Sequence, residues 1–188
     1  MRIIAGTARG ARLKAPKGID TRPTADRIKE SLFSILGQRV RGARVLDLFA
    51  GTGGLGLEAL SRGAAAAVFV DRATIPLIRE NAAHTHLLEC AQFLRQDVFS
   101  AVLRLAAAGE RFDLIFCDPP YEKGLWQRVL SALDGSPLLF PDALVMVECG
   151  AGEREIPSLS TLALRRAVGY GRTTQILIFE PCAARQEA

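Results

Sequence analysis

The sequence predicts an α/β protein built on a doubly wound, mostly parallel sheet of seven strands. Two observations support this fold class. From residue 43 onward, short apolar runs alternate with helical stretches, a pattern typical of a parallel sheet that is covered on both faces. Near the C-terminus, two apolar runs follow each other without a helix between them, which predicts an antiparallel hairpin at one edge. Before residue 43, the pattern predicts a small β-hairpin/helix extension.

The N-terminal extension is expected to begin with a hairpin. Residues 2–6 (RIIAG) and 12–16 (RLKAP) have the composition of short strands, and the Gly- and Arg-containing residues 7–11 between them favour a turn. We expect this hairpin to project from the body of the protein.

A helix is predicted next, over residues 25–36 (ADRIKESLFSIL). Its apolar side chains recur at helical spacing, and Gly37 suits the C-terminal cap. These apolar side chains are Ile28, Leu32, Ile35 and Leu36. The apolar face should pack on the body, which leaves Arg27 and Lys29 available for contacts elsewhere.

The body of the protein is predicted over residues 43–188. Its five parallel strands are expected at residues 44–49, 66–71, 92–97, 112–117 and 143–148. The helices between them are expected at residues 55–63, 73–87, 98–109 and 125–134. Residues 161–168 and 173–180, joined by GYGR, predict the two antiparallel strands.

The composition limits the class of protein. The chain has 188 residues, of which 49% are hydrophobic, enough to bury a substantial core. No apolar run has the length of a membrane span, and the N-terminus reaches Gly and Arg too early for a signal peptide. The four cysteines contain no CxxC pair. We therefore expect a cytoplasmic, monomeric protein without a metal or a membrane anchor.

The charge is distributed unevenly along the chain. Residues 1–44 carry eleven Lys and Arg against three Asp and Glu, whereas residues 45–188 carry thirteen against seventeen. A basic arm on a mildly acidic body is typical of proteins that bind polyanions, because neutralised phosphates supply most nonspecific affinity for nucleic acids. A solvated basic surface would have the same composition.

A glycine-rich loop follows the first parallel strand. Gly51, Gly53 and Gly56 in DLFAGTGGLG have the G-x-G-x-x-G spacing between a strand and a helix, which lets a ligand approach the backbone closely. Ligands of doubly wound sheets bind at the carboxyl ends of the strands. A tight strand–helix turn without a ligand is the alternative interpretation.

Acidic residues end the next two strands. Asp71 could accept both hydroxyls of a ribose, or be a surface acid. Asp97 could accept a hydrogen bond from an adenine amino group while Val98 covers the ring, although a helix N-cap is an equal alternative for Asp97. Asp47, just before the glycine loop, suits a cationic amino-acid group better than a pyrophosphate. This favours S-adenosylmethionine over a nicotinamide dinucleotide.

The sequence DPPY, residues 118–121, ends the fourth parallel strand. Two consecutive prolines donate no backbone N–H and stop the ladder there, which predicts a stiff loop. The Asp118 carboxylate and the Pro119 carbonyl are two acceptors that match an exocyclic –NH2 group, and Tyr121 offers a ring for stacking on a base. We interpret the loop as a clamp for an amino group that accepts a methyl group.

These motifs together resemble the Rossmann-like S-adenosylmethionine-dependent methyltransferases. More closely, the chain is similar to the RsmD type, the bacterial 16S rRNA (guanine(966)-N(2))-methyltransferases. The resemblance extends over nearly the full length, through RIIAGTARGARL, RPTADRIKESLF, VLDLFAGTGGLGLEALSRGA, FDLIFCDPPY and GYGRTTQILIFE. It implies an extension over residues 1–42 that binds RNA and a methyltransferase domain over residues 43–188.

The resemblance also implies a role for individual residues. Cofactor-binding positions would be Asp47, Ala50, Gly51, Thr52 and Gly53 at the methionine end, Asp71 and Arg72 at the ribose, and Asp97 and Val98 at the adenine. Asp118, Pro119 and Tyr121 would hold the target guanine. The RNA would contact Arg9, Arg12, Lys14, Arg22, Thr24, Arg27, Pro120 and Arg172. Thr52, Gly54 and Asp71 depart from the Ser, Ala and Glu that are commoner at these positions.

Other functions present a similar amino group or loop. A DNA methyltransferase that acts on adenine N6 or cytosine N4 would use the same clamp, but the chain has no obvious target-recognition domain. A protein-glutamine N-methyltransferase is a further alternative, because an amide –NH2 fits the clamp. An NAD-dependent oxidoreductase would bind NAD instead of S-adenosylmethionine, and a noncatalytic RNA-binding protein would bind neither.

Overall fold

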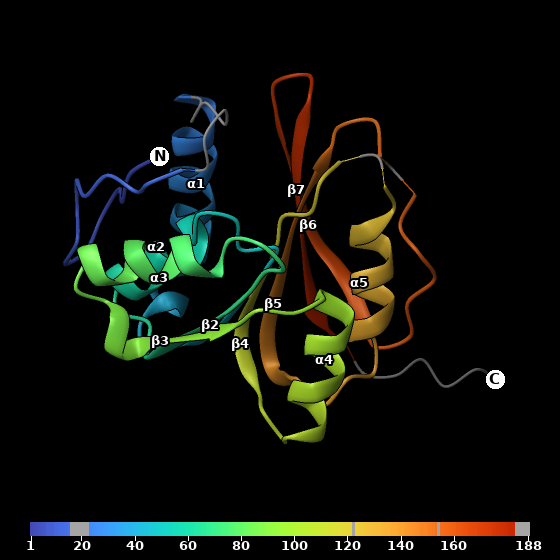
Figure 1. Cartoon of the computed structure of the whole chain (residues 1–188). Coiled ribbons are helices and arrows are strands. Elements are labelled where there is room, and N and C mark those ends of the chain that lie inside the picture. Colours follow the sequence, from blue (N-terminus) through green and yellow to red (C-terminus); the bar gives the residue numbers. More distant parts are fainter. Residues whose placement is uncertain (16–22, 122, 154, 183–188) are drawn as a thin grey trace. The chain divides into compact units, whose positions relative to one another are not determined.

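A computed structural model describes residues 1–15, 23–121, 123–153 and 155–182 of the chain (Figure 1). It divides into two compact units, Met1–Val98 and Phe99–Ala188, which we call unit 1 and unit 2. The expected division at residue 42, into an RNA-binding extension and a methyltransferase domain, stays a prediction.

Seven strands form a mixed sheet, as the sequence predicted. In unit 1, the parallel strands β1 (Arg44–Leu48), β2 (Ala66–Val70) and β3 (Ala91–Leu94) lie in the order β3-β2-β1. In unit 2, β4 (Phe112–Cys117) and β5 (Leu139–Gly150) are parallel. There, β7 (Thr174–Pro181) pairs antiparallel with both β5 and β6 (Leu162–Tyr170), which confirms the C-terminal hairpin.

The helices follow the predicted order. Unit 1 contains α1 (Pro23–Leu36), α2 (Gly54–Ser61), α3 (Ile75–His84) and the short 3₁₀ helices η1 (Gly37–Val40) and η2 (Leu88–Cys90). Helix α4 (Val98–Ala107) begins at the end of unit 1, and α5 (Leu125–Leu133) lies in unit 2. Helices α2 and α3 pack against β2, and α5 packs against β5 (Figure 1).

Strands β1 and β2 are buried on both sides. Every residue of β1 and β2 after the first is buried, as expected for strands whose two faces are covered. Helix α2 approaches this sheet closely at Gly56, where an added Cβ would lie 2.3 Å from the ring of Phe69. That ring stacks on Phe93 of β3, with centroids 5.6 Å apart. A glycine is therefore required at residue 56 to let α2 pack on the sheet.

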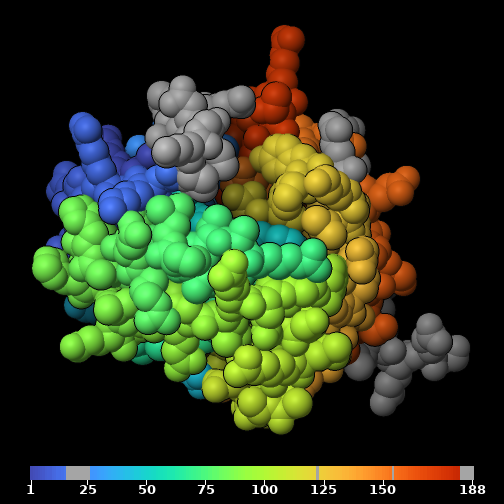
Figure 2. Space-filling model, in the orientation of Figure 1, coloured from blue at the N-terminus to red at the C-terminus, as the bar shows by residue number. Residues whose placement is uncertain are grey.

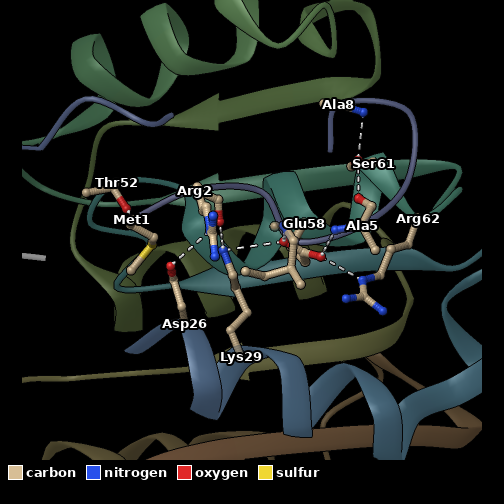
Figure 3. A network of polar contacts seen from close by, with 12 residues as sticks. Met1, Arg2, Ala5, Ala8, Asp26, Lys29, Thr52, Glu58, Ser61 and Arg62 are labelled. Carbon is tan, nitrogen blue, oxygen red and sulfur yellow. Dashed lines mark hydrogen bonds and ion pairs between the residues drawn. The ribbon is translucent and has the colours of Figure 1, made fainter. Parts of the chain in front are cut away.

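The N-terminal hairpin differs from the expected one. Within residues 1–15, its two arms form a single antiparallel bridge, Arg2 with Arg12, and no regular strand. It packs on α2 and does not project: the Glu58 carboxylate accepts hydrogen bonds from the N–H groups of Ile4 (2.7 Å) and Ala5 (3.1 Å) (Figure 3). The Ser61 hydroxyl donates to the carbonyl of Ala5 at 2.6 Å. Backbone groups that a second strand would satisfy are thus satisfied by α2.

The expectation that Lys29 is available for contacts at the surface is wrong. Its side chain is 2% exposed, so it is not available at the surface. Its Nζ donates to the carbonyl of Arg2 at 2.5 Å and lies 3.4 Å from Glu58 Oε2 (Figure 3). Burial lowers the pKa of Lys29, and the neighbouring Glu58 opposes that effect. Lys29 therefore fastens α1 to the hairpin and to α2.

The structure also bears on the membrane question. Among the described residues, the longest helices remain too short or too polar to span a bilayer.

Candidate active site

The loop between β1 and α2 has a backbone conformation that depends on glycine. Phe49, Gly51 and Gly53 all have positive φ, at 59°, 56° and 77°. Gly53 is also the N-cap of α2. At Gly53, an added Cβ would lie 2.8 Å from Ile78 of α3, so both the conformation and the packing require glycine. At the start of α2, Gly53 and Gly54 are buried, and the N–H of Gly53 donates to the carbonyl of Ala50 at 2.7 Å. Gly51 and Thr52 are the partly exposed residues of this loop.

Asp71 holds this loop in place from the end of β2. Its Oδ2 accepts a hydrogen bond from the N–H of Gly51 at 3.1 Å, and its Oδ1 accepts from the N–H groups of Ala73 and Thr74 at 2.8 and 2.9 Å. Burial alone would raise the pKa of Asp71, but these hydrogen bonds outweigh it and hold the pKa below its ordinary value. Asp71 is therefore an ionised acceptor, and its Oδ2 retains capacity for a ligand hydroxyl.

Asp47 lies beneath the same loop, in β1. Its carboxyl is 2% exposed, and its Oδ2 accepts a hydrogen bond from the N–H of Gly56 at 2.8 Å. Burial raises the pKa of Asp47 to about 7, the Gly56 hydrogen bond opposes this rise, and the charge of Asp71 adds to it. A buried carboxylate with this pKa is unstable as an anion unless a cation approaches it.

The remaining predicted cofactor residues lie at the neighbouring strand ends. Arg72 and Asp97 form an ion pair in which the Arg72 side chain is mostly exposed. Val98 is 3% exposed and begins α4. Asp97 therefore has a charged partner at the place where the sequence suggested an adenine contact or a helix cap. Unit 1 brings the loop glycines together with Asp47 and Asp71, and places the Arg72–Asp97 pair after β2 and β3.

The chemistry of these donors fits S-adenosylmethionine. The cofactor would present an ammonium group for Asp47, ribose hydroxyls for Asp71, and the face of its adenine ring for Val98. A pyrophosphate fits less well, because two carboxylates, Asp47 and Asp71, flank the loop that would have to receive it.

The DPPY residues of unit 2 form a short, anchored loop after β4. Asp118 and Pro120 are exposed, and Pro119 is buried between them. The ring of Tyr121 is 37% exposed, whereas its hydroxyl donates to Glu148 Oε1 at 2.8 Å and lies 3.2 Å from Thr174 Oγ1. Burial and the neighbouring Glu148 raise the pKa of Tyr121, so the phenol is neutral at physiological pH. The ring is thereby held at one orientation by its hydroxyl.

Glu148 and Thr174 are site residues that sequence reasoning missed. Glu148 ends the apolar run ALVMVE in the sequence, as Asp71 ends AAVFVD, so the same rule could have identified it, although β5 continues to Gly150. Thr174 begins β7, the antiparallel neighbour of β5 at this point, where Gly150 pairs with it. Its contact with Tyr121 depends on a strand 53 residues away, for which the sequence carries no signal.

The predicted RNA contacts lie mainly on the hairpin and α1. Arg9, Arg12 and Arg27 are exposed, and Lys14 forms a surface ion pair with Glu80 at 2.8 Å. Figure 2 shows the hairpin at the surface beside α3. A groove of about 470 Å³ lies between the hairpin and α1. The residues that line it include Arg2, Arg9, Asp26, Arg27 and Glu30.

Arg22, Thr24 and Arg172 are three further predicted RNA contacts. Thr24 belongs to the first turn of α1, and Arg22 falls outside the described residues. Arg172 is exposed in the turn between β6 and β7. Whether any of these residues contacts RNA remains a prediction.

The chain is similar to known proteins over most of its length. The profile of a family described as "Conserved hypothetical protein 95" matches residues 1–179. The Bacillus subtilis protein YlbH is 40% identical over 176 residues, which cover 92% of this chain and 95% of that protein. Ribosomal RNA small subunit methyltransferase D of Escherichia coli is 39% identical over 150 residues, or 79% of this chain and 74% of that protein.

The chain is also similar to a solved structure, in fold as well as in sequence. The Escherichia coli methyltransferase homologue yhhF superposes with a TM-score of 0.82 at 34% identity. The match covers 97% of this chain and 99% of that one. The likeness therefore extends over nearly the whole of both chains.

Proposed function

The chain belongs to the family of the ribosomal RNA small subunit methyltransferase D proteins, and we propose that it transfers a methyl group from S-adenosylmethionine to the exocyclic N2 amine of a guanine in small-subunit rRNA. The family resemblance of its motifs points to guanine 966 of the 16S rRNA. Such an enzyme would act in the cytoplasm, on the small ribosomal subunit or one of its assembly intermediates. The observation that carries this proposal is the DPPY loop, whose tyrosine is anchored by Glu148 and Thr174, in a chain that also carries the cofactor loop.

The target amine is a weak nucleophile. Its lone pair is delocalised into the purine ring, so it must become more localised before nitrogen can attack carbon. We propose that the Asp118 carboxylate and the Pro119 carbonyl accept its two N–H hydrogens. Those two hydrogen bonds strengthen as the nitrogen becomes tetrahedral and positively charged, which stabilises the transition state more than the ground state. Methyl transfer would break the carbon–sulfur bond of the cofactor and release S-adenosylhomocysteine, and the positively charged nitrogen would then give one proton to the Asp118 carboxylate, which can pass it to water. Because this proton would be lost after the transfer, no strong base is needed before it.

Tyr121 would stack on the purine ring. Stacking of this kind contributes roughly 1–3 kcal/mol per base in proteins that bind single strands. The hydrogen bond to Glu148 and the contact with Thr174 fix the ring before the base arrives, so little side-chain entropy is lost on binding. A guanine must leave its base stack to reach such a clamp.

The cofactor would be held by residues of unit 1. Bound S-adenosylmethionine supplies an electrophilic methyl group on a sulfonium. Asp47 would face its ammonium group and Asp71 its ribose, while Gly51, Thr52 and Gly53 would present backbone groups to the methionine portion. Support comes from the ionised state of Asp71 and from the burial of Asp47 without a cationic partner among the described residues.

The RNA would be bound through the basic hairpin and α1. The groove between them contains Arg9 and Arg27, neither of which forms an ion pair in the described part of the chain. These side chains are available to phosphates, and neutralised phosphates supply most of the salt-dependent affinity for nucleic acids. Arg2, in contrast, lies 3.5 Å from Asp26 and is partly neutralised.

Asp118→Asn tests this mechanism. The change removes the charge and half of the acceptor capacity at nearly constant volume. We expect the rate of transfer to small-subunit rRNA to fall about 100-fold or more, as in other sites that lose one transition-state hydrogen bond. Asp113→Asn, in β4 just before this loop, is the control and should keep the wild-type rate. The affinity for S-adenosylhomocysteine should stay within about twofold in both variants. An unchanged rate in Asp118→Asn would show that the clamp is wrong.

A further inference from the structure

Asn81 connects two segments of unit 1 that the proposed function assigns to different ligands. It lies on α3 and is 1% exposed. Its Nδ2 donates to the carbonyl of Thr52 at 2.9 Å and to the carbonyl of Lys14 at 3.0 Å. Its Oδ1 accepts from the N–H of Lys14 at 2.8 Å. One buried amide thus binds both the cofactor loop and the end of the basic hairpin.

The contact with Thr52 completes the support of the cofactor loop. Asp71 holds the N–H of Gly51 from the end of β2, and Asn81 holds the carbonyl of the next residue from α3. Thr52 lies between Gly51 and Gly53, which both have left-handed backbone conformations. Such a segment keeps one conformation only when its surroundings fix it. Asn81 fixes this segment by its hydrogen bond to the carbonyl of Thr52.

The contact with Lys14 is made through the backbone of the hairpin. Asn81 pairs with both the N–H and the carbonyl of Lys14, as a neighbouring strand would. The Lys14 side chain adds only the exposed pair with Glu80. The hairpin segment that ends at Lys14 also carries Arg9 and Arg12. A displacement of this segment would therefore change the position of Asn81 directly.

A second contact joins the same two segments. The Met1 side chain lies over the cofactor loop, with Sδ 3.4 Å from Thr52 Oγ1 (Figure 3). An added Cβ at Gly54 would lie 2.2 Å from that sulfur, so glycine at this position leaves room for Met1. The departure from the commoner alanine at residue 54 thus has a packing explanation.

We propose that Asn81 is a positioning residue that couples the basic hairpin to the cofactor loop, so that RNA and cofactor bind cooperatively. The inference rests on the proposed function for the assignment of the two ligands. RNA bound to the hairpin orders the Lys14 segment, Asn81 is held more firmly, and the loop around Thr52 keeps its binding conformation. Because coupling free energies are reciprocal, the cofactor in turn tightens RNA binding.

Two variants on the same helix test the coupling. Asn81→Ala removes all three hydrogen bonds. Thr85→Val is the matched control, because the Thr85 hydroxyl is also buried but bonds only to carbonyls of its own helix, those of Asn81 and Ala82. Dissociation constants for S-adenosylhomocysteine are measured with and without saturating small-subunit rRNA. Circular dichroism shows whether each variant is folded.

The expected outcomes separate the two variants. In the wild type and in Thr85→Val, RNA should lower the dissociation constant about fivefold or more, within the range usual for allosteric coupling. In Asn81→Ala, the constant without RNA should rise about tenfold, the loss expected for buried hydrogen bonds, and RNA should no longer change it. Equal behaviour of the two variants would overturn the proposal.

A measurement on the wild type keeps the proposal testable if Asn81→Ala does not fold. Saturating S-adenosylhomocysteine should slow amide hydrogen exchange in residues 11–15, and leave the β6–β7 hairpin unchanged. Unchanged exchange in residues 11–15, with the ligand bound, would overturn the coupling and leave the proposed function intact. Absence of S-adenosylhomocysteine binding would instead contradict the proposed function itself.

Discussion

Asp47→Asn should stabilise the free protein at neutral pH while weakening cofactor binding. Asp47 is buried in β1, and burial raises its pKa from the ordinary value of 3.8 to about 7. Between these two pH values the folded state holds a proton that the unfolded state has released. The free energy of unfolding therefore falls as pH rises from about 4 to about 7, because the carboxyl must ionise in an apolar surrounding.

The magnitude follows from the size of the shift. A rise from 3.8 to about 7 is roughly 3 pKa units, and each unit corresponds to 1.36 kcal/mol, so the full effect is about 4 kcal/mol. Asparagine keeps an oxygen that can accept from the N–H of Gly56 and carries no charge. Relative to the wild type, the variant should gain roughly 3 kcal/mol of stability between about pH 5 and about pH 8.

Urea unfolding without cofactor measures this difference. Wild type and Asp47→Asn are compared at about pH 5 and pH 8, so that any pH-independent effect of the substitution cancels. Asp142→Asn, an exposed carboxylate in β5, is the control and should change stability by less than about 0.5 kcal/mol at either pH. A gain in Asp47→Asn that is the same at both pH values would refute the reasoning.

The raised pKa of Asp47 also predicts that cofactor binding depends on pH. An ammonium group near Asp47 favours the ionised carboxylate, so binding releases a proton wherever the free carboxyl is protonated. Wild-type affinity for S-adenosylmethionine should decrease as pH falls below about 7, by up to about tenfold per pH unit. Asp47→Asn should bind more weakly at about pH 8 and lose this pH dependence. Affinity that is independent of pH in the wild type would show that Asp47 does not face a cation.

Two further predictions concern the substrate. Tyr121→Phe removes the hydrogen bond to Glu148 but keeps the ring. Because the ring is then free to rotate before RNA binds, we expect the KM for RNA to rise about three- to tenfold while cofactor affinity stays unchanged. Steady-state kinetics measures this KM, and an unchanged value would show that the hydrogen bond does not matter for RNA binding. Replacing Arg9, Arg12 and Lys14 with Gln should weaken RNA binding and lower the slope of log affinity against log salt by about 2 to 3, close to the number of phosphates released. Filter binding over a range of salt concentrations measures that slope, and an unchanged slope would remove the hairpin from the RNA interface.

The fold was largely predictable, because the strands of the body are short apolar runs separated by amphipathic helices. The first residue of β5 was harder to predict. The prediction began at Ala143, where the apolar run ALVMVE starts, whereas β5 begins at Leu139 and includes Pro141. The structure accommodates the proline where the pairing with β4 is irregular, between Leu139 and Leu144. Such an irregularity depends on the partner strand and leaves no local pattern.

The positions of the candidate site residues were predictable where these residues lie near strand ends. Asp71 ends one apolar run, Asp118 follows another, and Asp47 lies next to the last residue of β1, so their places near the carboxyl edge of a parallel sheet follow from the fold. Glu58 and Lys29 were not predictable, because a polar residue within a helix ordinarily faces solvent. Here the hairpin, more than fifty residues before Glu58 in the chain, covers that face of α2. Asn81 escaped notice for the same reason.

The most direct test of the account is the identity of the methylated nucleoside. Small ribosomal subunits from cells that lack this activity are incubated with the protein and S-adenosylmethionine that carries a labelled methyl group. The RNA is then digested to nucleosides and the labelled one is identified, with Asp118→Asn as the parallel reaction. The account predicts label in N2-methylguanosine for the wild type and almost none for the variant. Label in another nucleoside, or none in RNA while DNA or protein amides accept it, would contradict the account.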